Sequence, residues 1–253
     1  MRLSELILIE SKDALLLIPE KKVLINTINA HSFNVAQKDE LFAEALQNGD
    51  YLIPDGASIV KACHWLKAKS QPKERITGWE LFSFEMERLE RKSEKDDSST
   101  PSTSLGIVKS KVMFMGSSES VLAKIKEKAA VDYPNLEVVT YSPPYKAEFS
   151  QEDNNAIINA INEADPDLLW IGMTAPKQEK WTYQHWNELD IHCHVGTIGA
   201  VFDFYAGTVK RAPKWMQEHS FEWLYRLIKE PKRMWRRYLI GNVLFIRNMI
   251  MIG

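Results

Sequence analysis

Short apolar segments, rich in β-branched residues, alternate along most of this chain with segments in which apolar positions recur at helical spacing. The apolar segments are as short as strands, and the amphipathic segments are as long as helices. We therefore expect strands at 23–28, 51–53, 112–115, 136–141, 168–171 and 192–197. We expect helices at 35–47, 57–67, 78–91, 118–131, 151–162 and 176–187. This alternation predicts an α/β fold, with a Rossmann-like, mainly parallel sheet flanked by helices.

Two regions depart from this alternation. Residues 92–110 are poor in apolar side chains and rich in Ser, Thr and Asp, which predicts a flexible insertion, with a domain joint as the alternative. From Lys214 onward the pattern is helical, interrupted at Pro231, and basic residues flank an aromatic and aliphatic face. We therefore expect an α/β core at 1–206 and a basic amphipathic helical appendage at 207–253. The appendage either lies on a membrane surface or packs on the sheet with its charges in solvent.

The charge distribution sets the C-terminus apart. The net charge of the chain is −2, yet residues 207–247 hold ten Lys or Arg against three Glu. The rest of the chain therefore has 22 basic and 31 acidic residues, a charge of −9. A basic, aromatic end on an acidic body predicts an anionic partner for that end, such as an anionic membrane surface.

Composition also bears on the cellular compartment. Two cysteines, Cys63 and Cys193, are too few for a disulfide framework and fit a reducing cytosol. Acidic residues among the first twenty positions argue against a signal peptide, and no window holds the roughly 18 uncharged apolar residues of a membrane span. We therefore expect a cytoplasmic protein without a spanning helix.

Polar side chains follow several of the predicted strands. Asp55 comes after a short strand, where a general base would be useful, although a turn or helix cap is the commoner role for such a residue. Thr27 and Asn29 end the first strand and could bind sugar hydroxyls or only shape the turn. Lys177 and Gln178 open a helix after a buried strand, a natural place for an anion. An ordinary strand-to-helix turn is the alternative there.

The segment 202–213 places an acid among aromatic residues, followed by a glycine and two adjacent cations. Asp203 could accept hydrogen bonds from a base or ribose, and Arg211 could neutralise a phosphate by forked donation. The alternative is a buried aspartate paired with a nearby arginine.

Other sequence motifs give weaker or no support for a metal-binding or nucleotide-binding site. Asp165 and Asp167 have the D-x-D spacing of metal-dependent sugar transferases, but they precede a strand, where a turn needs such residues. His192 and His194 would share a strand face without an evident third metal ligand, so buried or solvated histidines are expected. The chain contains no dinucleotide-binding glycine motif, no P-loop and no G-x-S-x-G motif.

Six ordered motifs resemble a known family, the bacterial glycosyltransferases of the WecG/TagA/CpsF type (glycosyltransferase family 26). The similarity extends from Lys22 to Tyr238. The motifs are INTIN at 25–29, PDG at 54–56, ERITG at 74–78, a segment with PKQEKW at 172–181, FDF-x-AG with KRAP at 202–213, and EWLYRL leading to EP and RR at 222–237.

The resemblance implies an activity and its partners. It implies inverting, metal-independent transfer of an N-acetylhexosamine-type sugar from a UDP-sugar to a polyprenyl-diphosphate-linked sugar, with no cofactor. The products would be cell-surface polysaccharides of the teichoic acid, capsule or enterobacterial common antigen type. The resemblance also implies a peripheral position on the inner face of the bacterial cytoplasmic membrane, and a homo-oligomer is possible.

The resemblance assigns roles to individual residues. Asp55 corresponds to the proposed catalytic base, while Thr27, Asn29 and Gln178 match positions near the sugars and Arg75 matches a pocket arginine. The remaining substrate-binding candidates, for the nucleoside and the diphosphate, are Tyr145, Lys177, Asp203, Arg211, Arg226, Arg233 and Arg236.

Two rival functions remain open from the sequence. A catalytically idle nucleotide-sugar or lipid-binding module would keep Asp203 and the basic tail but would not need Asp55. A nucleic-acid binder would use the Arg- and Trp-rich tail, but the acidic remainder of the chain and the lack of a nucleic-acid fold motif disfavour it.

Overall fold

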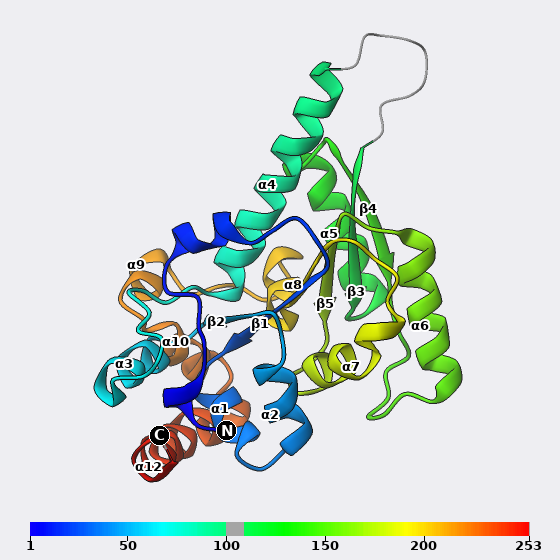
Figure 1. The fold of residues 1–253 in the computed structure, drawn as a ribbon. Helices are drawn as coiled ribbons and strands as arrows, with labels where there is room; N and C mark the ends of the chain where they lie inside the picture. The colour runs from blue at the N-terminus through cyan, green and yellow to red at the C-terminus, as the bar shows by residue number, and fades with distance from the viewer. Residues whose placement is uncertain (100–108, 253) are drawn as a thin grey trace. The chain divides into compact units, whose positions relative to one another are not determined.

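The computed structural model describes residues 1–99 and 109–252, with the side chains of all of these except 95–99 and 233. Six strands form one sheet in the order β2-β1-β6-β5-β3-β4 (Figure 1). The pairs β1–β6, β6–β5, β5–β3 and β3–β4 are parallel. The expected α/β fold with a parallel sheet is therefore confirmed. The strands are β1 (Val23–Ile28), β2 (Tyr51–Pro54), β3 (Ser110–Gly116), β4 (Leu136–Tyr141), β5 (Leu168–Gly172) and β6 (His194–Thr197).

Contacts divide the chain into two compact units. We call Met1–Ile18, Asn26–Thr77 and Val209–Gly253 the first unit, and Pro19–Ile25 and Gly78–Thr208 the second unit. The C-terminal segment begins close to the boundary expected at 206–207, but it belongs to the same unit as Asn26–Thr77. The region expected as one core at 1–206 is thus shared between the two units.

The helices fall into these units as follows. The first unit holds η1 (Leu3–Glu5), η2 (Lys12–Leu17), α1 (Ala30–Ala36), α2 (Glu40–Gln47), α3 (Ala57–Leu66), α9 (Lys214–Glu218), α10 (Glu222–Lys229), α11 (Pro231–Trp235), the π-helix η4 (Arg236–Ile240) and α12 (Gly241–Ile252). The second unit holds α4 (Gly78–Ser99), α5 (Glu119–Asp132), α6 (Gln151–Ala164), α7 (Lys177–His185), η3 (Trp186–Glu188) and α8 (Gly199–Tyr205).

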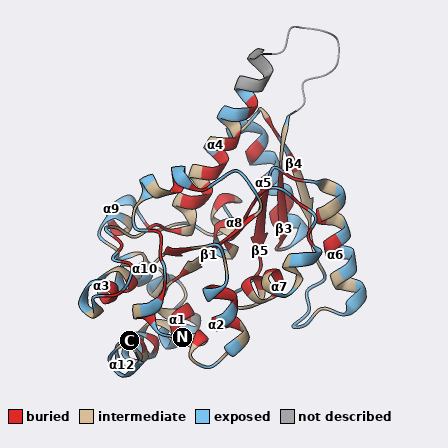
Figure 2. Cartoon of the chain, viewed as in Figure 1, coloured by how far each residue is buried: buried red, intermediate tan, exposed pale blue. Residues whose placement is uncertain are grey.

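Each unit has its own hydrophobic core, and buried residues follow the strands and one side of most helices (Figure 2). In the first unit, Phe33 and Phe42 pack with residues of α3, α12 and the N-terminal segment. In the second unit, Ile157 of α6 and Trp181 of α7 pack on apolar side chains of β3, β5 and β6. This burial explains why β5 and the middle of β3 read as unbroken apolar runs in the sequence.

One expected helix is in fact two. The segment 35–47 was expected to be a single amphipathic helix, but α1 ends at Ala36 and α2 begins at Glu40. The side chain of Asp39 accepts a hydrogen bond of 3.0 Å from the backbone N–H of Phe42, so Asp39 caps a new helix. N-capping by aspartate competes with continuation of the preceding helix.

The expected insertion at 92–110 is shorter than predicted. Helix α4 continues through Ser99 and β3 begins at Ser110, while residues 100–108 lie outside the described part of the chain. Ser93 is buried and donates a hydrogen bond of 2.8 Å to the carbonyl of Asn135. Glu90 accepts hydrogen bonds from the backbone and side chain of the same asparagine. Composition alone did not reveal these contacts, which hold a polar helix in place.

The C-terminal segment is helical, as expected. It consists of α9 and α10, followed by a continuous helical stretch from α11 through η4 to α12, with Pro231 at the first position of α11. Helix α8, by contrast, was not expected from the sequence. None of the helices that the structure describes is long and apolar enough to cross a membrane.

Candidate active site

Asp55 and Asn29 meet at the carboxyl ends of two neighbouring strands. Asp55 directly follows β2, and its backbone N–H donates a hydrogen bond of 2.9 Å to the carbonyl of Ile28, the last residue of β1. The amide nitrogen of Asn29 lies 3.5 Å from Oδ2 of Asp55. The structure therefore brings together two residues that the sequence placed at separate strand ends.

The orientation of the Asn29 amide is fixed by the backbone. Its Oδ1 accepts hydrogen bonds from the N–H groups of His31 (3.0 Å) and Ser32 (3.1 Å) at the start of α1. An amide oxygen that accepts two donors must turn its NH2 group away from them, and this group faces the carboxylate of Asp55. Asn29 is thus both a helix cap and a partner of the candidate base.

Asp55 itself does not cap a helix. Helix α3 begins at Ala57 after the N-cap residue Gly56, which has no side chain. A Cβ at Gly56 would lie 3.4 Å from the Cβ of Asn29, so the loop passes close to that residue. Thr27, half-buried on β1, lies one residue before the end of the strand.

Cationic side chains of the first unit come from several elements. Arg75 donates a hydrogen bond to the carbonyl of Gln217 on α9. Nε of Arg211 lies 3.8 Å from Oε1 of Glu222, so its ion-pair partner in this unit is on α10. Both arginines are half-buried. Substrate contact by these two residues stays a prediction.

The other predicted arginines lie on the C-terminal helices. Arg226 is half-buried on α10, and Arg236 is exposed on η4 with its guanidinium 5.2 Å from the ring centre of Trp235. Arg233 belongs to α11, but its side chain lies outside the described part of the structure.

His31 is a residue that the sequence analysis did not single out. It follows Asn29 by two positions, and burial together with the positive charge of Arg237 lowers the pKa of its imidazole to about 4. His31 is therefore a neutral hydrogen-bonding group near neutral pH. The available signal was its position three residues after the end of β1, close to Thr27 and Asn29 in the chain.

In the second unit, Gln178 is buried and joins two loops. Its Oε1 accepts hydrogen bonds of 3.1 Å from the backbone N–H of Met173, after β5, and of 3.1 Å from that of Gly199, after β6. Its Nε2 donates to Oε1 of Glu179 at 2.9 Å. The sequence motif contained Glu179, but its role was not predicted.

The other substrate-binding residues predicted for the second unit are Lys177, Asp203 and Tyr145. Nζ of Lys177 donates to the carbonyl of Lys146 and lies 3.4 Å from the ring centre of Phe149. Burial lowers the pKa of this ammonium group. Asp203, half-buried on α8, accepts a hydrogen bond of 3.2 Å from the hydroxyl of Thr208. Tyr145 is fully exposed between β4 and α6.

Asp165 and Asp167 form the turn before β5. Asp165 ends α6 in the left-handed region, with φ of 41°. Oδ2 of Asp167 accepts a hydrogen bond of 2.7 Å from the backbone N–H of Lys111. Both residues thus perform the turn role that the sequence favoured for them.

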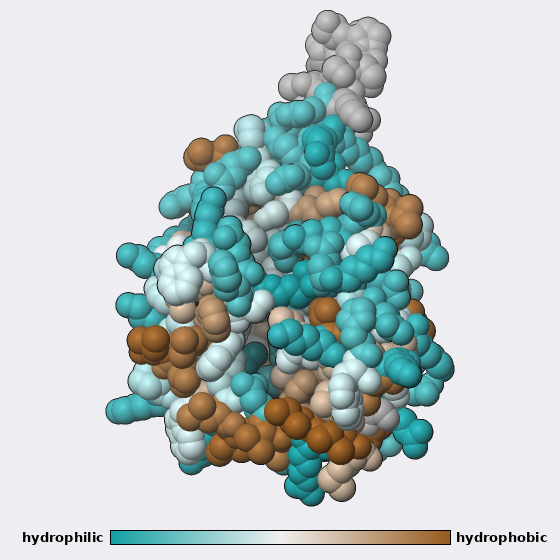
Figure 3. All heavy atoms as spheres, turned by 90° about the vertical axis from the view of Figure 1, so that its left-hand side faces the viewer, coloured by the Kyte–Doolittle hydropathy of each residue, from teal (hydrophilic) through white to brown (hydrophobic). Residues whose placement is uncertain are grey.

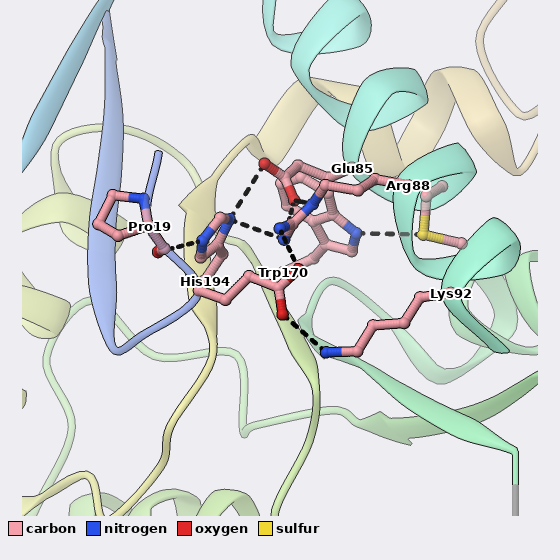
Figure 4. Close-up of polar contacts among 8 residues, drawn as sticks. Pro19, Glu85, Arg88, Lys92, Trp170 and His194 are labelled. Carbon is pink, nitrogen blue, oxygen red and sulfur yellow. Dashed lines mark hydrogen bonds and ion pairs between the residues drawn. The ribbon is translucent and has the colours of Figure 1, made fainter. Parts of the chain in front are cut away.

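His194 begins β6 and is held by polar contacts in the interior (Figure 4). Its Nε2 lies 3.0 Å from the carbonyl of Pro19, which can only accept, so this nitrogen carries a proton. Its Nδ1 lies 3.0 Å from Nη2 of Arg88 and 3.1 Å from Oε1 of Glu85. His194 is therefore a buried histidine with internal partners, as expected. A cleft of about 250 Å³ beside it is lined by Lys21, Lys92, His192 and the 165–167 turn, at the amino ends of β5 and β6.

Comparison with known proteins identifies relatives. Residues 9–252 match the family described as "Glycosyl transferase WecG/TagA/CpsF family". The chain is similar to proteins named N-acetylglucosaminyldiphosphoundecaprenol N-acetyl-beta-D-mannosaminyltransferase from three organisms. The Bacillus subtilis protein is 28% identical over 216 residues, covering 85% of this chain and 75% of the relative. The Bacillus spizizenii protein is 28% identical over 83% of this chain and 76% of the relative. The Staphylococcus aureus protein is 27% identical over 215 residues, which cover 85% of this chain and 75% of the relative.

Proposed function

We propose that this chain, which belongs to the glycosyl transferase WecG/TagA/CpsF family, transfers an N-acetylhexosamine-type sugar from a UDP-sugar to a polyprenyl-diphosphate-linked sugar. The family match confirms the resemblance read from the motifs, and the chain is a glycosyltransferase of cell-surface polysaccharide biosynthesis. The names of the relatives favour an N-acetylmannosamine-type donor and an N-acetylglucosamine acceptor on undecaprenyl diphosphate.

The contact between Asp55 and Asn29 carries the mechanistic part of the proposal. The carboxylate of Asp55 takes the proton of the acceptor hydroxyl as that oxygen attacks the anomeric carbon. The bond between this carbon and the diphosphate of the donor breaks, and attack from the opposite face inverts the configuration. Asn29, itself fixed by two backbone N–H groups, keeps the carboxylate in one orientation.

Negative charge develops on the departing diphosphate, and positive groups must stabilise it. We assign this task to cationic side chains rather than to a metal ion. The candidates are Arg75, Lys177, Arg211, Arg226, Arg233 and Arg236. We also place the reaction at the inner face of the cytoplasmic membrane, because a polyprenyl-linked acceptor stays in the bilayer.

The test is a donor screen with a lipid-diphosphate N-acetylglucosamine analogue, a panel of UDP-sugars and EDTA in the buffer. We expect the release of UDP with one donor and a loss of at least about a hundredfold in Asp55→Asn, because general base catalysis contributes factors of this size. Asn has the shape of Asp, so the fold should persist. Asp13→Asn, at an exposed position of the same unit, is the matched control and should keep wild-type rates.

Three outcomes would contradict the proposal or one of its parts. Turnover by Asp55→Asn within threefold of wild type would exclude Asp55 as the base. UDP binding without turnover of any donor would indicate the idle binding module instead. A requirement for added Mn²⁺ or Mg²⁺ would exclude the metal-independent mechanism.

A further inference from the structure

Gln178 is held in one orientation by two backbone donors. The N–H groups of Met173 and Gly199 both donate to its Oε1 at 3.1 Å, so its NH2 group must face the other way. The side chain is buried, and turning the amide by 180° would place its NH2 group, which cannot accept, against both backbone donors. The Gln178 amide thus links the segment after β5 to the segment after β6.

Glu179 completes this arrangement. Its Oε1 accepts a hydrogen bond of 2.9 Å from Nε2 of Gln178, and the residue is only 2% exposed. Its Oε2 is buried and has no hydrogen-bond partner among the described residues. Burial raises the pKa of this carboxyl to about 7. A carboxyl in this position can accept from Gln178 whether it is neutral or charged, but the charged form is costly there.

We propose that Glu179 is a positioning residue of the transfer reaction, which holds the Gln178 amide in the orientation that ties Met173 to Gly199. This inference rests on the proposed function. It gives a role to a buried acid that the mechanism above does not use.

Each of the two linked segments is followed in the chain by a residue predicted to bind the UDP-sugar. Gly199 begins α8, which carries Asp203, and Met173 precedes the turn that leads to Lys177. The segments already touch, because a Cβ at Gly199 would lie 2.2 Å from the carbonyl oxygen of Met173. Loss of the amide orientation would therefore displace α8 and the turn together, and it would weaken binding of the UDP-sugar.

The experiment compares Glu179→Gln with Glu179→Leu in the full chain. Gln keeps an oxygen that accepts from Gln178, whereas Leu has a similar volume and no acceptor. We expect Glu179→Gln to keep kcat and KM within about twofold of wild type. We expect Glu179→Leu to raise KM for the UDP-sugar about tenfold, the effect of losing one buried hydrogen bond, with a smaller change in kcat.

A control separates positioning from general destabilisation. Thr182 is buried on the same helix and donates a hydrogen bond of 2.8 Å to the carbonyl of Gln178, without contact to its amide. Thr182→Val should lower the melting temperature while leaving KM unchanged. If Glu179→Leu fails to fold, Glu179→Ala takes its place, because a smaller side chain introduces no clash.

Three results would overturn the inference: wild-type KM in Glu179→Leu, equal KM defects in Glu179→Leu and Glu179→Gln, or an equal KM defect in Thr182→Val. Failure of the proposed function is distinguishable from these results, because the wild-type protein would then release no UDP with any donor.

Discussion

At the scale of single residues, each unit contains a side-chain amide that backbone N–H groups orient toward a carboxyl group. Asn29 receives two N–H groups at the start of α1 and faces Asp55. Gln178 receives two N–H groups from separate loops and faces Glu179. In both cases the peptide backbone decides which end of the amide meets the acid. The two acids differ in burial, because Asp55 is half-buried whereas Glu179 is inaccessible.

The buried carboxyl predicts how stability depends on pH. The pKa of Glu179 is about 7 in the folded protein and near its usual 4.5 in the unfolded chain. Between these values the folded protein keeps a proton that the unfolded chain has lost, so stability falls as pH rises from about 4.5 to about 7. Glu179→Gln lacks this loss and should be more stable than wild type at pH 8, by up to about 3 kcal/mol, but not at pH 4.

Urea unfolding at the two pH values measures this difference. An equal difference between the variant and the wild type at pH 4 and pH 8 would show that folding does not raise the pKa of Glu179. Glu163→Gln, at an exposed acid of α6 in the same unit, is the matched control for loss of a carboxylate and should change the free energy of unfolding by less than about 0.5 kcal/mol.

At the scale of elements, the C-terminal helix is docked on α1 by polar and apolar contacts. Asn34 donates a hydrogen bond of 2.7 Å to the carbonyl of Gly241 and accepts one of 3.1 Å from Asn248. The rings of Phe33 and Phe245 meet edge to face, with centroids 5.6 Å apart. Helix α12 is therefore part of the first unit's core rather than an independent arm.

This docking predicts a large effect for one substitution. Phe245 is 4% exposed within the cluster that includes Phe33. Phe245→Ala should lower the free energy of unfolding by about 3–5 kcal/mol, because it removes a buried ring and leaves a cavity. Ile246→Ala, at a 53% exposed neighbour, should change it by less than about 0.5 kcal/mol. Urea unfolding checks both, and similar values for the two variants would show that α12 is not docked.

The elements also show what sequence patterns can predict. Each strand was found to within two residues, because short segments rich in apolar and β-branched residues stand out between the longer helical segments. The gap between α1 and α2 was missed, because the apolar spacing runs through a cap at Asp39. The polar end of α4 was missed because its contacts lie with residues about 40 positions away.

At the scale of the whole molecule, the basic C-terminal segment also exposes apolar side chains. Apolar surface gathers along the lower edge of the face shown in Figure 3, the end of the molecule at which Figure 1 places α12. The exposed apolar residues of η4 and α12 are Leu239, Ile240, Val243, Ile246, Ile250, Met251 and Ile252. Exposed Arg236 and Arg247 lie in the same helical stretch. Apolar residues beside cations are typical of surfaces that lie on anionic lipid.

We therefore expect the chain to bind vesicles that contain phosphatidylglycerol, and to bind them less at high salt. Replacing Val243 and Ile250 together by Asp should reduce this binding at least tenfold, because it removes apolar surface and adds negative charge. Both residues are more than half exposed, so the fold should tolerate the change. Cosedimentation measures binding, and Val131→Asp, at a 79% exposed position of α5, is the control. Equal losses in both variants, or none, would contradict a role for α12 at the membrane.

The site residues were predicted from motifs, and their spatial grouping was not. Asp55 and Asn29 were both identified in the sequence, but their contact depends on the adjacency of β1 and β2. The division of the chain into two compact units cuts across β1 and joins the N-terminal third to the C-terminus. Such long-range associations leave no local periodicity in a single sequence.

The glycines beside the Gln178 loops limit how this protein can diverge. A Cβ at Gly172 would lie 2.5 Å from the ring of Phe202, and one at Gly199 would lie 2.2 Å from a backbone oxygen. Both positions therefore reject every larger residue, and neither loop can be reshaped by substitution there. The exposed segment 144–148 has no such restriction. New donor preferences within this lineage should consequently arise by change in that segment, around Tyr145, while the glycines stay invariant.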